Sequence, residues 1–181
     1  MRLVSGCFGG RLCAAWQSHA AFGPWIASEF YDRGVTVQIS VIGSGVDHEP
    51  HAEEVGRLLA ERGCTVVCGG RGEVMAAAAR GAKSAGGTTI GILPGTSRAD
   101  ANEWIDHVVL TGLGHARNAI VATSGDGVIA VGGSYGTLTE IGFARIYARP
   151  VVILGPGLEV EGVPRAATPL EAVELVLASV A

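Results

Sequence analysis

The chain has 181 residues, of which 48% are hydrophobic and only 17% are charged, so it can bury a sizeable core and is not a disordered segment. Its formal net charge of −4 argues against non-specific binding to nucleic acid or to an anionic membrane surface. The 28 glycines cluster after apolar runs, which indicates tight turns between strands and helices.

The four cysteines do not form a metal-binding pattern. No Cys-x-x-Cys pair occurs and no Cys/His cluster has the spacing of zinc ligands, so we predict no metal site. We interpret the cysteines as small buried side chains in a reducing compartment. No apolar run approaches the roughly 20 residues that span a bilayer. We therefore predict a cytoplasmic protein without a membrane partner.

Residues 1–34 differ from the rest of the chain because they carry no clean hydrophobic period, apart from a short helical pattern over 24–34. We predict a poorly ordered N-terminal extension over 1–34, followed by a single Rossmann-like ligand-binding domain over 35–181.

From residue 35 onward, apolar strands alternate with helices. In chain order the pattern predicts strand 35–43, helix 48–63, strand 64–70, helix 72–87, strands 88–95 and 105–112, helix 114–125, strand 126–133, helix 134–149, strand 150–155 and helix 168–181. Pro50 and Gly63 mark the two ends of the first helix, and Thr168 is the expected N-cap of the last. Short buried strands joined by helical crossovers form a parallel sheet covered on both faces. The sequence therefore predicts an α/β fold, a doubly wound parallel sheet in a Rossmann-like three-layer sandwich.

Four glycine-bearing loops follow predicted strands, at the edge where such folds bind ligands. None is a complete dinucleotide fingerprint or a Walker A loop. Together they predict a ligand site, although each loop could instead serve only as a tight turn. The candidate ligand-binding residues are Gly43, Ser44, Gly45, Gly69, Gly70, Gly72, Gly114, Gly132, Gly133, Ser134, Tyr135, Gly136 and Thr137.

The loop at 132–137 is the predicted phosphate site, because the next helix directs free N–H groups and its positive dipole end into the cleft. Glu140 lies one turn further on the face of Gly136. A carboxylate would repel a phosphate beside it, so we expect Glu140 to serve another part of the ligand, such as ribose hydroxyls or a sugar carbon that develops positive charge. The alternative is an ordinary first-turn acid that stabilises the helix.

Arg117 is expected in the first turn of helix 114–125, where a cation opposes the helix dipole and needs another reason to be present. A ligand anion or Glu140 would supply that reason, and a solvated surface arginine is the alternative. His48 and His51 flank the first loop without a companion metal ligand, and we interpret them as helix-start or surface histidines.

The stretches 68–95 and 101–144 resemble the LOG-like superfamily, once mislabelled lysine decarboxylases, and the resemblance runs from about residue 35 to the C-terminus. The strings include "GGSYGTLTE" and "TGLGHARN". Val131 stands in place of the signature proline, and Asn118 in place of the lysine that follows the signature arginine. The residues that match the LOG signature are Arg117, Gly132, Gly133, Gly136, Thr137 and Glu140.

The resemblance implies two functions. LOG enzymes are phosphoribohydrolases that cleave nucleoside 5′-monophosphates into the base and ribose 5-phosphate. Carried over, Glu140 would be catalytic by stabilising an oxocarbenium-like ribose or activating water, and Arg117 would orient Glu140 and the substrate. The strings around 101–118 look closer to a sister branch of molybdenum cofactor carriers and Rossmann-type nucleotide-binding proteins, which bind a phosphorylated pterin or nucleotide in the same cleft.

Our first expectation is therefore a binding or carrier protein for a phosphate-bearing nucleotide or molybdopterin-type ligand. A phosphoribohydrolase of the cytokinin-activating type is the alternative, and a nucleotide-sensing module is a third possibility. The resemblance implies a homo-oligomer, a dimer or tetramer, with a nucleotide or molybdenum cofactor as bound ligand. We expect no nucleic-acid partner. Lysine decarboxylation is disfavoured because Lys83 is the only lysine and has ordinary surface character.

Overall fold

The computed structural model describes residues 35–180. The N-terminal extension predicted over 1–34 lies outside the described residues. Strands and helices alternate as predicted, with short 3-10 turns (η) between them. In chain order they are β1 Gln38–Ser44, η1 Val46–His48, α2 Glu49–Glu61, β2 Thr65–Cys68, α3 Val74–Ser84, β3 Thr89–Leu93, η2 Arg98–Asp100, β4 His107–Leu110, η3 Gly114–Arg117, α4 Asn118–Ser124, β5 Gly127–Gly132, α5 Tyr135–Ile146, β6 Val151–Leu154, β7 Arg165–Ala166 and α6 Pro169–Ser179.

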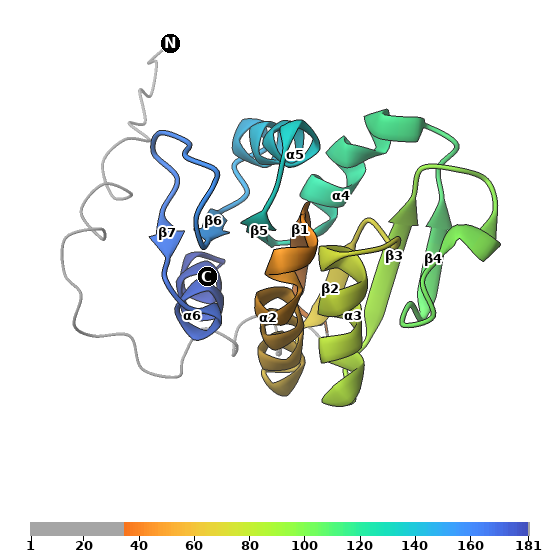
Figure 1. Cartoon of the computed structure of the whole chain (residues 1–181), viewed down its shortest axis with the longest axis horizontal. Coiled ribbons are helices and arrows are strands. Elements are labelled where there is room, and N and C mark those ends of the chain that lie inside the picture. The colour runs from red at the N-terminus through yellow and green to blue at the C-terminus, as the bar shows by residue number, and fades with distance from the viewer. Residues whose placement is uncertain (1–34, 181) are drawn as a thin grey trace, which may run out of the picture.

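The strands form one seven-stranded sheet in the order β4-β3-β2-β1-β5-β6-β7, and each neighbouring pair is parallel. Helices α2, α3 and α6 cover one face of the sheet, and α4 and α5 cover the other (Figure 1). The predicted doubly wound α/β sandwich is thus confirmed. Strands β1 and β5 are paired in the middle of the sheet although three other strands separate them along the chain.

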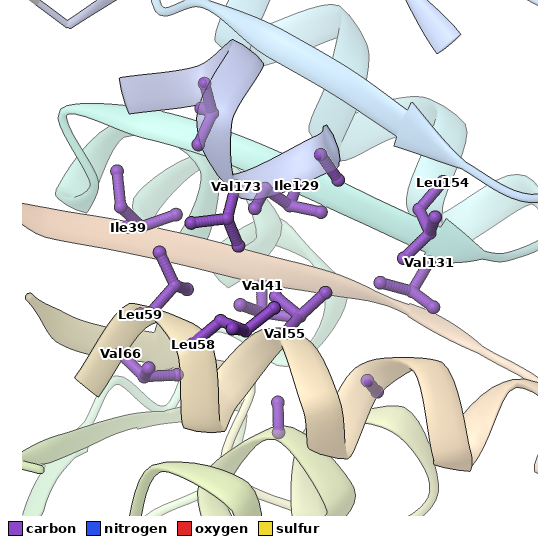
Figure 2. Packing of buried hydrophobic residues seen from close by; sticks show 14 of the residues in the cluster. Ile39, Val41, Val55, Leu58, Leu59, Val66, Ile129, Val131, Leu154 and Val173 are labelled. Atoms are coloured by element: carbon purple, nitrogen blue, oxygen red, sulfur yellow. The ribbon is translucent and has the colours of Figure 1, made fainter. Parts of the chain in front are cut away.

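Alternating residues of the strands pack into two buried cores, one on each face of the sheet. Ile39 and Val41 of β1 pack with α2, α3 and α6, as Figure 2 shows for part of this cluster. Ile42 packs with α4 and α5 on the opposite face. Each fully buried side chain of this size contributes about 1.5–3 kcal/mol, so the strands are held from both sides. The longest helix is α2 with 13 residues, and no helix within residues 35–180 could cross a membrane.

Local signals in the sequence explain several helix ends. Gly63, with a φ of 73°, follows the last residues of α2, and Pro50 lies in its first turn. The Thr168 hydroxyl accepts a hydrogen bond from the Glu171 N–H at 3.2 Å, which confirms the predicted cap of α6.

Several predicted element boundaries were wrong by two or more residues, and one strand was missed. The helix predicted over 114–125 begins as the 3-10 turn η3, and only residues from Asn118 onward form the α-helix α4. Gly114 has a φ of 55°, which is outside the helical region. Helix α3 begins at Val74 rather than at residue 72. Strand β7 was not predicted, because two residues carry no readable period.

Candidate functional site

A cleft opens at the carboxyl ends of β1 and β5, where the strand order changes direction. The chain builds β2, β3 and β4 on one side of β1 and then returns to place β5 on the other side. Such a switch point leaves a crevice that ligands occupy in open α/β sheets. The cleft encloses about 210 Å³, and its lining comes from the carboxyl end of β1, the loops after β2 and β5, the turn η3, and helices α3, α4 and α5.

The cleft brings together predicted residues from β1, from the loops after β2 and β5, from η3 and from α5. Those on its wall are Gly43, Ser44, Gly69, Arg117, Ser134, Gly136, Thr137 and Glu140. The other predicted residues lie in the same stretches of chain but do not line the cleft. They are Gly45, Gly70, Gly72, Gly114, Gly132, Gly133 and Tyr135. Tyr135 is 87% exposed. A Cβ at Gly70 would lie 2.9 Å from Leu93 Cδ2, so that glycine serves packing of the loop against β3.

Gly43 allows β1 and β5 to approach closely beneath the cleft. It pairs with Val131 and has a φ of 143°. A Cβ at this position would lie 2.0 Å from the Val131 carbonyl oxygen, so no other residue fits without moving a strand. The close approach of β1 and β5 therefore requires glycine at position 43.

The start of α5 opens into the cleft. Ser134 precedes the helix in an extended conformation and makes no capping hydrogen bond with its side chain. Gly136 and Thr137 of the first turn line the cleft. The first N–H groups of a helix have no partner within the helix, and the helix dipole is positive at this end. This arrangement can bind an anion such as phosphate.

A buried ion pair lies in the same cleft. Arg117 Nη1 is 3.4 Å from Glu140 Oε1, and the two side chains expose only 11% and 9% of their surface. Burial raises the pKa of Glu140 to about 7, and Arg117 offsets only part of this effect. Burial also lowers the pKa of Arg117, but an arginine stays protonated in proteins. Glu140 therefore exchanges a proton near neutral pH beside a fixed positive charge.

The second glycine loop positions the arginine. A Cβ at Gly69 would lie 2.7 Å from Arg117 Nη2 and 2.5 Å from Met75 Sδ, so the guanidinium rests where a side chain would stand. Among residues 35–180, Arg117 Nε is the one fully buried side-chain nitrogen or oxygen without a hydrogen-bond partner. The arginine is thus held by packing and by one long contact to Glu140, and it is not a solvated surface side chain.

Asn118 is a buried cleft residue that our site prediction omitted. It is 7% exposed, and its Nδ2 donates to Thr139 Oγ1 at 3.1 Å and to the Gly136 carbonyl at 3.4 Å. The Thr139 hydroxyl itself donates to the Gly136 carbonyl, so the amide must present its NH2 to this side. Asn118 Oδ1 has no partner among the described residues and is not fully buried, so it remains available as a hydrogen-bond acceptor.

The prediction also omitted Ile42, Met75 and His115, which complete the lining. His115 lies in the string "TGLGHARN", and its position beside Arg117 was a usable signal. The sequence pattern indicates that Ile42 and Met75 are core residues, and only the fold shows that they line the cleft. His48 immediately precedes α2, as expected of a helix-start histidine. Within residues 35–180, no group of three or more His, Cys, Asp or Glu side chains could hold a metal ion.

The fold and the cleft define a LOG-like protein of the Rossmann type, with similarity to the molybdenum cofactor carrier branch. The chain belongs to the SLOG cluster4 family, whose sequence profile matches residues 36–177. An uncharacterised protein of Archaeoglobus fulgidus is 43% identical over 146 residues, which cover 79% of this chain and 96% of that protein.

Solved structures and enzymes agree with this placement. The molybdenum cofactor binding protein of Rippkaea orientalis superposes with a TM-score of 0.76 at 34% identity, covering 81% of this chain and 99% of that one. The molybdenum cofactor carrier protein of Chlamydomonas reinhardtii gives a TM-score of 0.73 at 34% identity, covering 80% and 98%. The cytokinin riboside 5′-monophosphate phosphoribohydrolase of Mycobacterium tuberculosis is 34% identical over 58% of this chain and 61% of that enzyme.

Proposed function

We propose that this chain is a binding or carrier protein for a phosphate-bearing ligand, either a nucleotide or a molybdopterin-type cofactor. The observation that carries the proposal is the combination, in one cleft, of an uncapped helix start and a separate buried Arg117–Glu140 pair. The phosphate binds at Ser134–Thr137, where N–H groups are free. Glu140, Arg117 and Asn118 bind the polar middle of the ligand, away from its phosphate.

The relatives favour a carrier because the similarity to carrier structures extends over nearly their whole length, at 98–99% of each chain. The similarity to the M. tuberculosis phosphoribohydrolase extends over 61% of that enzyme. The further parts of the proposal are a homo-oligomer, a cytoplasmic location and no nucleic-acid partner. The net charge of −4 supports the last of these.

A second candidate is a nucleoside 5′-monophosphate phosphoribohydrolase, and the buried Arg117–Glu140 pair favours it. Ionised Glu140 would stabilise positive charge at the anomeric carbon of ribose as the bond to the base breaks. A pKa of about 7 also suits the transfer of a proton to or from water near neutral pH. Arg117 would hold the carboxylate and the substrate in position.

Incubation with AMP and other nucleoside monophosphates distinguishes the two functions. For a carrier we expect saturable binding of AMP or molybdopterin without release of free base. Release of base by the wild type, abolished in Glu140→Ala, would establish the hydrolase instead. Absence of both binding and release would overturn the proposal. Glu140→Gln keeps the size of the side chain and shows whether the negative charge or only the shape is needed.

A further inference from the structure

A hydrogen bond joins two of the glycine-bearing loops at the rim of the cleft. The Gly45 N–H donates to Glu73 Oε2 at 2.7 Å, although the residues are 28 apart in sequence. Gly45 follows β1, and Glu73 lies between β2 and α3, so the bond connects the carboxyl ends of two paired strands. A short bond from an amide to a carboxylate is a strong, charge-assisted one.

The backbone of Glu73 is held in a conformation that residues other than glycine rarely adopt, with a φ of 53° and a ψ of −131°. Such a conformation costs about 1–3 kcal/mol and persists only where other contacts hold it. Glu73 immediately precedes α3 but makes no hydrogen bond with its side chain to that helix. The carboxylate that could have capped its own helix instead reaches across to Gly45.

The Gly45 N–H lies beside the proposed phosphate loop. Ser44 pairs with Gly132 across β1 and β5. A Cβ built on Gly132 would lie 2.1 Å from His48 Cδ2, and one built on Gly45 would lie 3.1 Å from the same atom. One imidazole ring therefore lies against both Gly45 and Gly132, so the Gly45 N–H belongs to the same end of the β1–β5 pair as the loop that leads into α5. A carboxylate bound there is a negative group at the edge of the anion site.

We propose that Glu73 is an affinity-determining residue of the cleft: its carboxylate occupies the Gly45 N–H in the free protein and competes with the phosphate of the ligand for this donor. Binding of the phosphate displaces the exposed Glu73 side chain, which carries its charge into solvent. The competition lowers the affinity for any ligand that uses the Gly45 N–H. This inference rests on the proposed function, because it assumes that the ligand anion binds at the start of α5.

Two substitutions test the competition without threatening the fold. Glu73→Gln keeps the shape of the side chain and removes its charge, and Glu73→Gly suits the observed φ. Asp47→Asn is the matched control, because Asp47 is an exposed acid two residues from Gly45. That variant removes one negative charge from the segment that carries Gly45, and no hydrogen bond links the Asp47 side chain to Gly45 within the described residues.

Titrations with inorganic phosphate and with AMP, followed by calorimetry and by the Gly45 amide resonance, give the readout. We expect E73Q and E73G to bind both probes about three- to tenfold more tightly than the wild type, the range for loss of one partly exposed charged competitor. Asp47→Asn should change either affinity less than about twofold. Before any ligand is added, E73Q should already shift the Gly45 amide proton, because its hydrogen-bond acceptor changes.

Equal affinities in the wild type, E73Q and E73G would overturn the Glu73 proposal while leaving the phosphate site intact. Weaker binding in E73Q would overturn it too, because Glu73 would then support the site. If none of the proteins binds phosphate or AMP, the proposed function fails for these ligands and the competition fails with it. Binding by E73Q and E73G but not by the wild type would support the competition in its strongest form.

Discussion

Arg117 Nη1 lies 3.4 Å from Glu140 Oε1 in a cleft where both side chains are about nine-tenths buried. The contact is long for an ion pair, so the attraction of the arginine does not offset the cost of burying the carboxylate, and the pKa of Glu140 rises to about 7. Arg117 immediately precedes α4 and Glu140 lies in α5. The packing of α4 against α5, and of Gly69 against the guanidinium, fixes the distance between Arg117 and Glu140. This distance in turn affects the pKa of Glu140.

Stability should fall with rising pH because of Glu140. Its pKa is about 7 in the folded protein against an ordinary value of 4.5, so between these values the folded state holds more protons than the unfolded chain. The free energy of unfolding then decreases by up to about 3 kcal/mol as the pH rises from 4.5 to above 7. Chemical denaturation of the wild type and of Glu140→Gln at pH 5, 6, 7 and 8 measures this effect.

The difference between the two proteins isolates the contribution of the Glu140 carboxyl group, because the two proteins share every other side chain. The Glu140→Gln variant should lose this part of the decline and gain stability relative to the wild type as the pH rises. Parallel curves for the two proteins would show that the pKa of Glu140 is not raised.

Gly69→Ala should displace Arg117, because the new Cβ would lie 2.7 Å from Nη2 and 2.5 Å from Met75 Sδ. We expect a loss of about 1–3 kcal/mol from this overpacking. Affinity for AMP should fall at least about tenfold if Arg117 contacts the ligand. Gly72→Ala is the control, since a Cβ there has no neighbour within 4 Å. Calorimetric titration with AMP and thermal unfolding of both variants measure the two effects. Wild-type affinity in Gly69→Ala would remove Arg117 from the binding site.

The fold was predictable because most strands and helices carry a clear hydrophobic pattern within a short stretch of sequence. The buried strand β5 and the helix α5 follow directly from their apolar periods and from the glycines between them. The turn at Gly114 was misread because its φ of 55° depends on the route of the chain from β4 to α4, not on local composition. Strand β7 is defined only by its pairing with β6, a long-range contact that its own two residues do not indicate.

The site was predictable only where local pattern or resemblance pointed to it. The sequence indicates Arg117 and Glu140 as site residues, and their side chains do meet in the structure. The contact of Gly69 with Arg117 and the bond between Gly45 and Glu73 were not foreseeable. Each of these contacts joins residues far apart in sequence. The hydrophobic period of a segment does not determine which other loop it will contact. Asn118 shows the same limit, because its role depends on the packing of α4 against α5.

Asn118→Leu should destabilise the protein by about 0.5–1.5 kcal/mol, because it removes the part-buried hydrogen bonds that Nδ2 donates to Thr139 Oγ1 and to the Gly136 carbonyl. It should also weaken AMP binding if Oδ1 accepts a hydrogen bond from the ligand. Thr139→Val separates the structural role of Asn118 Nδ2 from a role of Oδ1 in ligand binding, since it removes one partner of Nδ2 but leaves Oδ1 in place. Urea denaturation and AMP titration of both variants provide the comparison. Equal losses of affinity in the two variants would mean that Asn118 acts only by positioning α5.

Gly136→Ala should separate binding from folding. Gly136 lies in the first turn of α5, and a Cβ there would meet only Asn118 Nδ2 at 3.8 Å, so alanine fits the protein. Replacing a helical glycine by alanine stabilises by about 0.5–1 kcal/mol, but the new methyl group stands in the cleft where the phosphate approaches. Gly142→Ala, in the same helix and with no neighbour within 4 Å of its Cβ, should give the stability gain alone. Thermal unfolding and phosphate titration compare the two variants, and Gly136→Val should weaken binding further. Undiminished phosphate affinity in Gly136→Ala and Gly136→Val would place the anion elsewhere than the start of α5.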